Sequence, residues 1–122
     1  MRTIYTASKT VHAPKWRALR AAGYSVNSTW IDEAGPGESA DLVDLARRCI
    51  DEAKAADSLL LYCEPGEVLK GALIEAGAAL AAGKVVRQVG TCVNDLSALS
   101  SHPLWKRYDT LGEALAAHAN GL

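Results

Sequence analysis

The sequence predicts an α/β fold: a single-domain three-layer α/β/α sandwich with a mostly parallel, flavodoxin- or Rossmann-like sheet of about four to five strands. Three observations predict it. Strand-like and helix-like patterns alternate along the chain, the run SLLLYC at 58–63 is continuously apolar, and 122 residues are enough for one such domain spanning 1–122. A continuously apolar strand is typical of a parallel sheet that helices cover on both faces.

Each element has its own local signal. Strand candidates are runs rich in β-branched and aromatic residues, and helix candidates have apolar residues at three- and four-residue spacing. The predicted strands are 3–7, 24–31, 58–63, 84–90 and a short fifth strand within 102–110. The predicted helices are 13–22, a long helix from a cap at Ser39 or Asp41 to Ala56, 68–82 and 111–119. Gly35-Pro36-Gly37 predicts a turn before the long helix.

Composition narrows the classes of function. With 13 Lys and Arg against 14 Asp and Glu, the net charge is −1, and no basic excess indicates a nucleic-acid partner. No apolar run has the roughly 20 residues of a membrane span, and the first residues lack the apolar core of a secretory signal. We therefore expect a cytoplasmic protein that binds neither nucleic acid nor membranes.

The cysteines and histidines predict neither a structural metal nor a cofactor. The cysteines are odd in number and form no CxxC pair, so we expect reduced thiols, and the histidines are far apart in sequence. Dinucleotide (GxGxxG), P-loop (GxxxxGK[ST]) and nucleophile-elbow (GxSxG) motifs are missing, although a nucleotide ligand needs none of them. The residues concerned are Cys49, Cys63, Cys92, His12, His102 and His118.

Glu75 stands alone as an acid in the helical segment LKGALIEAGAALAAGK. On a helix its neighbours three and four residues away are Gly71, Ala72, Ala78 and Ala79, so small side chains leave space around the carboxylate. Such a carboxylate can act as a nucleophile, as a base or as an acceptor for a ligand. The alternative is a solvated position on an Ala-rich helix.

Other candidates follow from the topology, because open parallel sheets bind ligands beyond the carboxyl ends of their strands. Glu64 and Glu67 follow the apolar strand there. Trp30 beside Asp32 offers a flat ring next to an acceptor, or else packs under the following loop. The segments that leave the predicted strands at this edge are Ser8-Lys9-Thr10, 30–33, 64–67 and Gly90-Thr91.

Three further positions have competing interpretations. Tyr5 either packs in the first strand or directs its hydroxyl to the site. Asp57 precedes the apolar strand, where it either accepts backbone N–H bonds or takes part in chemistry. Lys9, with the hydroxyl of Ser8, is a candidate contact for a phosphate, although short polar loops often have this composition.

Three segments, IYTASKT, AADSLLLY and GALIEAGAALAAGK, resemble the nucleoside 2-deoxyribosyltransferase-like superfamily over about the first 90 residues. In that family a strand Tyr, an Ala-Asp pair before an apolar strand, and a Gly- and Ala-rich helix with a central Glu occur in this order. The helix motif is the most specific of the three. The matching residues are Tyr5, Ala56-Asp57, Gly71, Glu75, Gly77, Ala79, Gly83 and Lys84.

The resemblance implies that Glu75 attacks the anomeric carbon of a nucleoside or nucleotide and forms a glycosyl-enzyme ester. Water then completes a hydrolysis, or a second base completes a transfer. The family commonly has an Asp six positions before the nucleophile to protonate the departing base, but this chain has Leu69. Glu67 or Glu64 is the candidate substitute. A second family acid falls at Cys49, with Asp51 close by.

Three hypotheses follow. The first is an enzyme that cleaves or transfers at an N-glycosidic bond, with Glu75, Asp57 and Glu67 as catalytic candidates. The second is a catalytically inactive nucleoside- or nucleotide-binding module of the same fold. The third is an interaction protein whose small-residue helix forms a subunit interface, and a homodimer or higher homo-oligomer fits all three. The predicted substrate contacts are Tyr5, Ser8, Lys9, Trp30, Asp32, Glu64 and Gly71.

Overall fold

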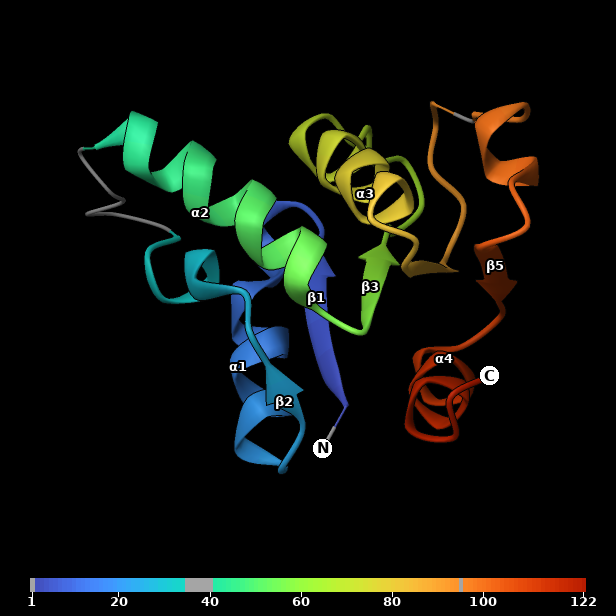
Figure 1. Ribbon diagram of the computed structural model, residues 1–122, viewed down its shortest axis with the longest axis horizontal. Helices are drawn as coiled ribbons and strands as arrows, with labels where there is room; N and C mark the ends of the chain where they lie inside the picture. The colour runs from blue at the N-terminus through green and yellow to red at the C-terminus, as the bar shows by residue number, and fades with distance from the viewer. Residues whose placement is uncertain (1, 35–40, 95) are drawn as a thin grey trace.

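The computed structural model describes residues 2–34, 41–94 and 96–122 (Figure 1). Their strands form one sheet in the order β2-β1-β3-β4-β5, and every neighbouring pair is parallel. This order is that of the flavodoxin-like doubly wound folds. The predicted fold class is therefore confirmed. The strands are β1 (Thr3–Ala7), β2 (Ser25–Val26), β3 (Ser58–Tyr62), β4 (Val85–Val89) and β5 (Trp105–Tyr108).

Helices cover both faces of the sheet. Figure 1 shows α2 and α3 on one side and α1 and α4 on the other. The α-helices are α1 (Ala13–Ala21), α2 (Leu42–Ala55), α3 (Gly71–Ala81) and α4 (Leu111–Ala119). Three short 3-10 helices accompany them: η1 (Thr10–His12), η2 (Thr29–Asp32) and η3 (Leu99–Ser101). Among the described residues, no helix is long and apolar enough to cross a membrane.

The core is centred on β3, as its apolar sequence predicts. Leu59, Leu60 and Leu61 are at most 1% exposed, because β1 and β4 flank the strand and helices cover both its faces. Asp57 accepts a hydrogen bond from the Thr3 N–H at 2.6 Å and so ties the amino ends of β1 and β3 together. The parallel pairing places the carboxyl ends of these strands at one edge.

The prediction of a strand over 24–31 is wrong in its second half. Strand β2 ends at Val26, and the chain turns into η2, where the Trp30 indole N–H donates to the Thr6 carbonyl at 2.8 Å. This bond draws Trp30 against β1, which an extended strand would not allow.

The third helix begins at Gly71 instead of residue 68. The Leu69 N–H donates to the Asn94 side chain at 3.1 Å and its carbonyl accepts from the same amide at 2.6 Å. The Leu69 backbone is therefore held outside the helix. At the start of α2, Asp41 is the cap, since its carboxylate accepts from the Asp44 N–H at 3.0 Å. Ser39 and the predicted Gly-Pro-Gly turn lie outside the described residues.

Gly90 lies in close contact with Cys63 at the carboxyl ends of β3 and β4. It has a φ of 88°, and a Cβ at this position would lie 1.9 Å from the Cys63 carbonyl oxygen. Gly90→Ala should therefore lower the free energy of unfolding by about 2–4 kcal/mol, through both strain and collision. Urea unfolding measures this, with Gly112→Ala in α4 as the control, because the nearest atom to its added methyl lies 4.0 Å away. Equal stability of the two variants would contradict the contact.

Candidate functional site

A cavity of about 580 Å³ opens beyond the carboxyl end of β1, between α2 and α3. Its walls come from the loop after β1, from Trp30 in η2, from α2 and from the start of α3. This is the edge of the sheet at which doubly wound folds bind ligands. The lining residues are Ser8, Lys9, Thr10, Val11, Trp30, Leu45, Cys49, Val68, Leu69, Lys70, Gly71, Ala72 and Glu75.

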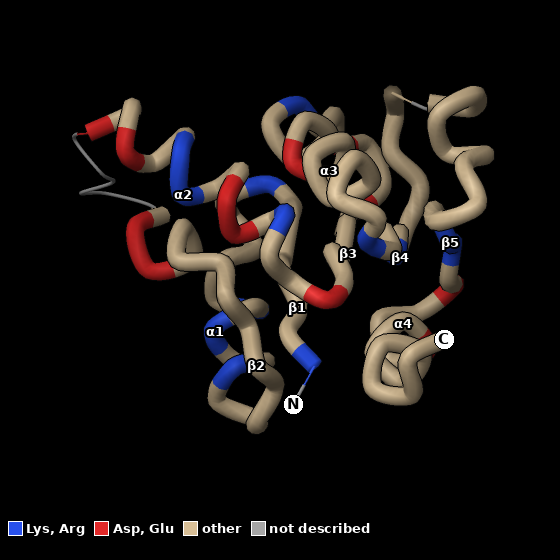
Figure 2. Tube along the Cα trace, in the orientation of Figure 1, with Lys and Arg blue, Asp and Glu red and all other residues tan. Residues whose placement is uncertain are grey.

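Glu75 lines this cavity and is the one charged residue within α3, whose sequence is GALIEAGAALA (Figure 2). Burial raises the pKa of Glu75 to about 7, and the negative charge of Glu52 adds to the rise. Interactions with the Tyr5 hydroxyl and the Cys49 thiol act in the opposite direction. Near neutral pH the carboxyl group is therefore a mixture of its ionised and protonated forms.

Tyr5 supports Glu75 from the sheet. The residue is fully buried, and its hydroxyl makes no hydrogen bond of regular geometry to a described residue. Burial raises the pKa of Tyr5 above its usual range, and the charge of the nearby Glu75 raises it further. The hydroxyl is therefore a protonated donor that lies close to both the Glu75 carboxylate and the Cys49 thiol.

Two cations and one aromatic ring complete the cavity wall. Lys9 and Lys70 line the cavity, and Trp30 is 8% exposed. The Trp30 indole N–H is engaged by Thr6, so its ring is the part that remains for stacking. The Ser8 hydroxyl accepts from the Trp16 indole at 2.8 Å and donates to the Lys9 carbonyl at 2.9 Å. These bonds hold the loop after β1 in place.

Of the predicted site residues, the structure brings Ser8, Lys9, Trp30, Gly71 and Glu75 together around the cavity, with Tyr5 directly behind Glu75. The other predicted acids lie elsewhere. Asp57 is at the amino end of β3, bonded to Thr3, and Asp32 forms an ion pair with Arg20 at 2.8 Å. Glu64 and Glu67 lie beside the cavity without lining it. Leu69, at the position where the resembled family commonly has an Asp, is part of the cavity wall.

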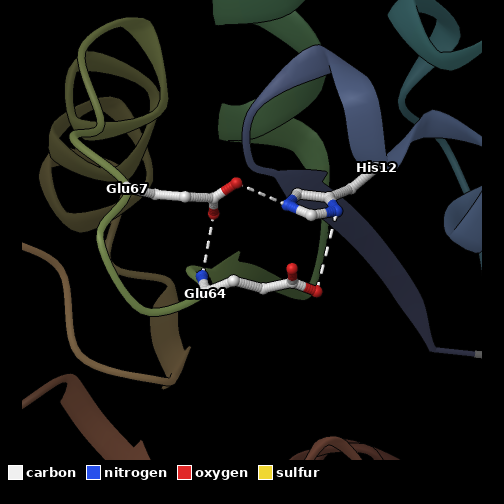
Figure 3. A group of neighbouring side chains, drawn as sticks. All are labelled: His12, Glu64 and Glu67. Atoms are coloured by element: carbon white, nitrogen blue, oxygen red, sulfur yellow. Dashed lines mark hydrogen bonds and ion pairs between the residues drawn. The ribbon is translucent and has the colours of Figure 1, made fainter.

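Glu64 and Glu67 flank the His12 ring (Figure 3). The Glu67 carboxylate lies 2.8 Å from His12 Nε2, and its other oxygen accepts from the Glu64 N–H at 2.8 Å. Glu64 accepts from the Tyr62 hydroxyl and lies 3.9 Å from His12 Nδ1. Burial alone would raise the pKa of Glu67, but the Glu64 N–H, His12 and the charge of Lys9 hold it below its usual value.

This His12 cluster contains the atom types that bind a divalent metal, all within 4.8 Å of one another. However, both Glu67 oxygens are already engaged, and Glu64 and Glu67 lie against different nitrogens of the same ring. The geometry is that of a clamp. It joins the end of η1 to the turn at 64–67, in which Gly66 has a φ of 85° and the Glu67 N–H donates to the Glu64 carbonyl.

Comparison with known proteins identifies a shared fold. No family model matches the chain, and no curated protein matches it. Among solved structures, the chain is similar to the CMP N-glycosidase BcmB of Clostridium botulinum, with a TM-score of 0.57 and 18% sequence identity. The match covers 99% of this chain and all of BcmB, so it extends over the whole sheet and its helices.

The sequence pattern does not predict where Lys70, His12 and Cys49 lie in the structure. Lys70 directly precedes α3 and lines the cavity, whereas the sequence pattern predicts it only as part of the helix over 68–82. His12 is 55 residues from Glu67, and no motif links the two. In the sequence, Cys49 is an apolar position of the long helix and matches the place of the second acid of the resembled family, and neither observation predicts a thiol beside Glu75. Cys49 lies one helical turn after Leu45, and this spacing is the sequence signal that places both residues on the same side of α2, where they line the cavity.

Removal of the Glu75 charge should change the pH dependence of stability. The native state holds the Glu75 proton more tightly than the unfolded chain, so stability falls as pH rises from 4.5 to about 7. Glu75→Gln abolishes this loss. Its free energy of unfolding relative to the parent should therefore increase by up to about 3 kcal/mol between about pH 4 and about pH 8.

Urea unfolding at several pH values between these limits measures the effect. Asp51→Asn, which changes an exposed carboxylate in α2, is the matched control and should leave the pH dependence as it is. A Glu75→Gln variant with the same pH dependence as the parent would contradict the assignment.

Disruption of the His12 clamp should lower stability. Glu67→Gln weakens a largely buried pair, in which the His12 and Glu67 side chains are 10% and 15% exposed, and should cost about 1–3 kcal/mol. Glu64→Gln is the control, because the Glu64 side chain is 46% exposed and its pairing with His12 is longer. Thermal unfolding of the two variants should rank them in this order, and the reverse order would disprove the clamp.

Proposed function

We propose that the protein cleaves the N-glycosidic bond of a nucleoside or nucleotide, with Glu75 as the nucleophile. The observation that carries this proposal is the half-buried Glu75 carboxylate in the wall of a cavity at the carboxyl edge of the sheet. The sequence resemblance and the fold shared with a CMP N-glycosidase support the same chemistry. Glu75 combines a reactive group with room for a sugar, since its helical neighbours are Gly and Ala.

In the proposed reaction, a Glu75 carboxylate oxygen forms a bond to the anomeric carbon. The bond between that carbon and the base nitrogen breaks, and its electron pair leaves with the base. Water then attacks the anomeric carbon of the resulting ester and releases the carboxylate. Over the cycle, one water molecule supplies the hydroxyl group to the sugar and a proton to the base. Transfer to a second base in place of water is the alternative outcome.

The cavity favours a substrate with a phosphate. Lys9 and Lys70 place two cations in a wall that otherwise consists mainly of apolar groups. A sugar bound against Glu75 would leave a 5′-phosphate free to reach an ammonium group, and the Trp30 ring provides a surface on which a base can stack. We therefore propose a nucleoside 5′-monophosphate as the first substrate class to test.

A binding module without turnover is the second candidate function, and the surroundings of Leu69 favour it. Leu69 is 2% exposed and cannot give a proton to a departing base. Glu67 is engaged on both oxygens in the His12 clamp, and Glu64 accepts from Tyr62. In this alternative Glu75 accepts hydrogen bonds from ribose hydroxyls and no bond is broken.

A homodimer or higher homo-oligomer is proposed with either function. The exposed side of α3 consists of small and apolar residues, among them Ile74, which is 69% exposed, and Gly77. A helix that is apolar on all sides is usually buried on all sides, and small residues permit a close approach of two helices. A second copy packed here would cover a surface beside the cavity.

Base release from a panel of nucleosides and their 5′-monophosphates, followed by chromatography, tests the proposal. Parent protein should release base, and Glu75→Ala should lower the rate at least about 1000-fold, as expected for a lost nucleophile. Lys9→Ala should raise KM for the monophosphates more than for the nucleosides. The same panel with an added acceptor base distinguishes hydrolysis from transfer.

Glu113→Gln, which changes an exposed carboxylate in α4 that does not line the cavity, is the control, with the rate of the parent expected. Ligand-induced thermal stabilisation by a member of the panel, without base release, would support the binding module instead. Both candidate functions are wrong if no nucleoside or monophosphate of the panel stabilises the folded protein and none of them releases its base.

A further inference from the structure

Cys49 occupies an unusual place for a cysteine of this chain. It projects from α2 into the cavity wall that Glu75 reaches from α3, whereas Cys63 and Cys92 do not line this cavity. Burial raises the pKa of the Cys49 thiol, and the charges of Glu75 and Glu52 raise it further. The group is therefore an S–H donor at neutral pH and a poor nucleophile.

The Tyr5 hydroxyl provides a second, independent observation at the same point. It approaches from β1, is fully buried, and has no regular hydrogen-bond partner among the described residues. A buried hydroxyl without a partner is costly, so an acceptor is expected next to it. The groups that influence it most are the Glu75 carboxylate and the Cys49 thiol. Three elements thus direct polar groups at one spot beside the cavity.

The other ionisable groups around Glu75 do not offer it a neutral donor. Glu52, from the next turn of α2, is an acid and disfavours a second negative charge. Lys9 and Lys70 are cations in other parts of the same wall. Among the described groups that influence the Glu75 pKa, Tyr5 from β1 and Cys49 from α2 are the neutral donors.

We propose that Cys49 is a positioning residue for Glu75: the Cys49 thiol donates to the Glu75 carboxylate and, together with the Tyr5 hydroxyl, favours its ionised form and directs it into the cavity. The proposal that this affects turnover rests on the proposed function, but the interaction between Cys49 and Glu75 does not. The thiol gives Glu75 a neutral donor at a position where the resembled family has an acid, and the charge of an acid would repel that of Glu75 and favour its protonated form.

Titration of the Glu75 side-chain carboxyl carbon by NMR tests the interaction without any substrate. Cys49→Ala removes the donor with little change in volume and should raise the Glu75 midpoint by about 0.5–1 pH unit. Cys49→Ser restores a donor and should return the midpoint close to that of the parent. Tyr5→Phe should shift it in the same direction as Cys49→Ala.

The matched control is Cys92→Ser, since Cys92 interacts with Cys63 and not with Glu75. Its Glu75 midpoint should equal that of the parent. A Cys49→Ala midpoint that also equals the parent value would overturn the proposal, as would a Cys49→Ser midpoint that follows Cys49→Ala. Thermal unfolding of each variant confirms that the comparison is between folded proteins.

The pH profile of kcat/KM links the interaction to function. If base release occurs, its acidic limb should move upward in Cys49→Ala by the same amount as the NMR midpoint and return in Cys49→Ser. An unmoved limb would overturn the role of Cys49 in turnover. If the midpoint shifts and no substrate releases base, the proposed enzymatic function is wrong, while the positioning of Glu75 by Cys49 stands.

Discussion

The parallel pairing of β3 with β1 and β4 is the constraint on which the rest of the structure depends. Its register sets Tyr5 beside Leu59, so that the Tyr5 hydroxyl lies on the face covered by α2 and α3. It also brings the loop after β1 and the turn after β3 to one edge, where the His12 clamp joins them. The cavity lies at this edge because the loop after β1 meets α2 and the first turn of α3 there.

Much of this arrangement is predictable from local pattern. The apolar run at 58–63 marks a covered strand, and the small neighbours of Glu75 mark a carboxylate with space around it. Both signals depend on residues within a few positions of each other. The same is true of the Asp41 cap, which is one of the two alternatives, Ser39 or Asp41, that the sequence predicts.

Long-range contacts account for what the sequence did not predict. Trp30 turns the chain away from β2 because its indole bonds to Thr6, 24 residues earlier, and Asn94 delays the start of α3 through Leu69, 25 residues earlier. The interaction of Cys49 with Glu75 likewise needs α2 and α3 to pack together. The spacing of apolar residues along the sequence does not indicate such pairs, because their members are far apart in the chain.

The composition of α3 has a consequence for the entropy of binding. The part of the cavity wall that it forms consists of Gly71, Ala72 and the half-buried Glu75, and of these Gly71 and Ala72 have no side-chain rotamers to lose. A ligand bound against Gly71 and Ala72 would therefore cost little side-chain entropy. Lys9 and Lys70, by contrast, have long side chains and would lose much rotational freedom on contact. The rigid wall is therefore suited to fixing the orientation of a bound molecule, and the flexible cations to accommodating variation at its charged end.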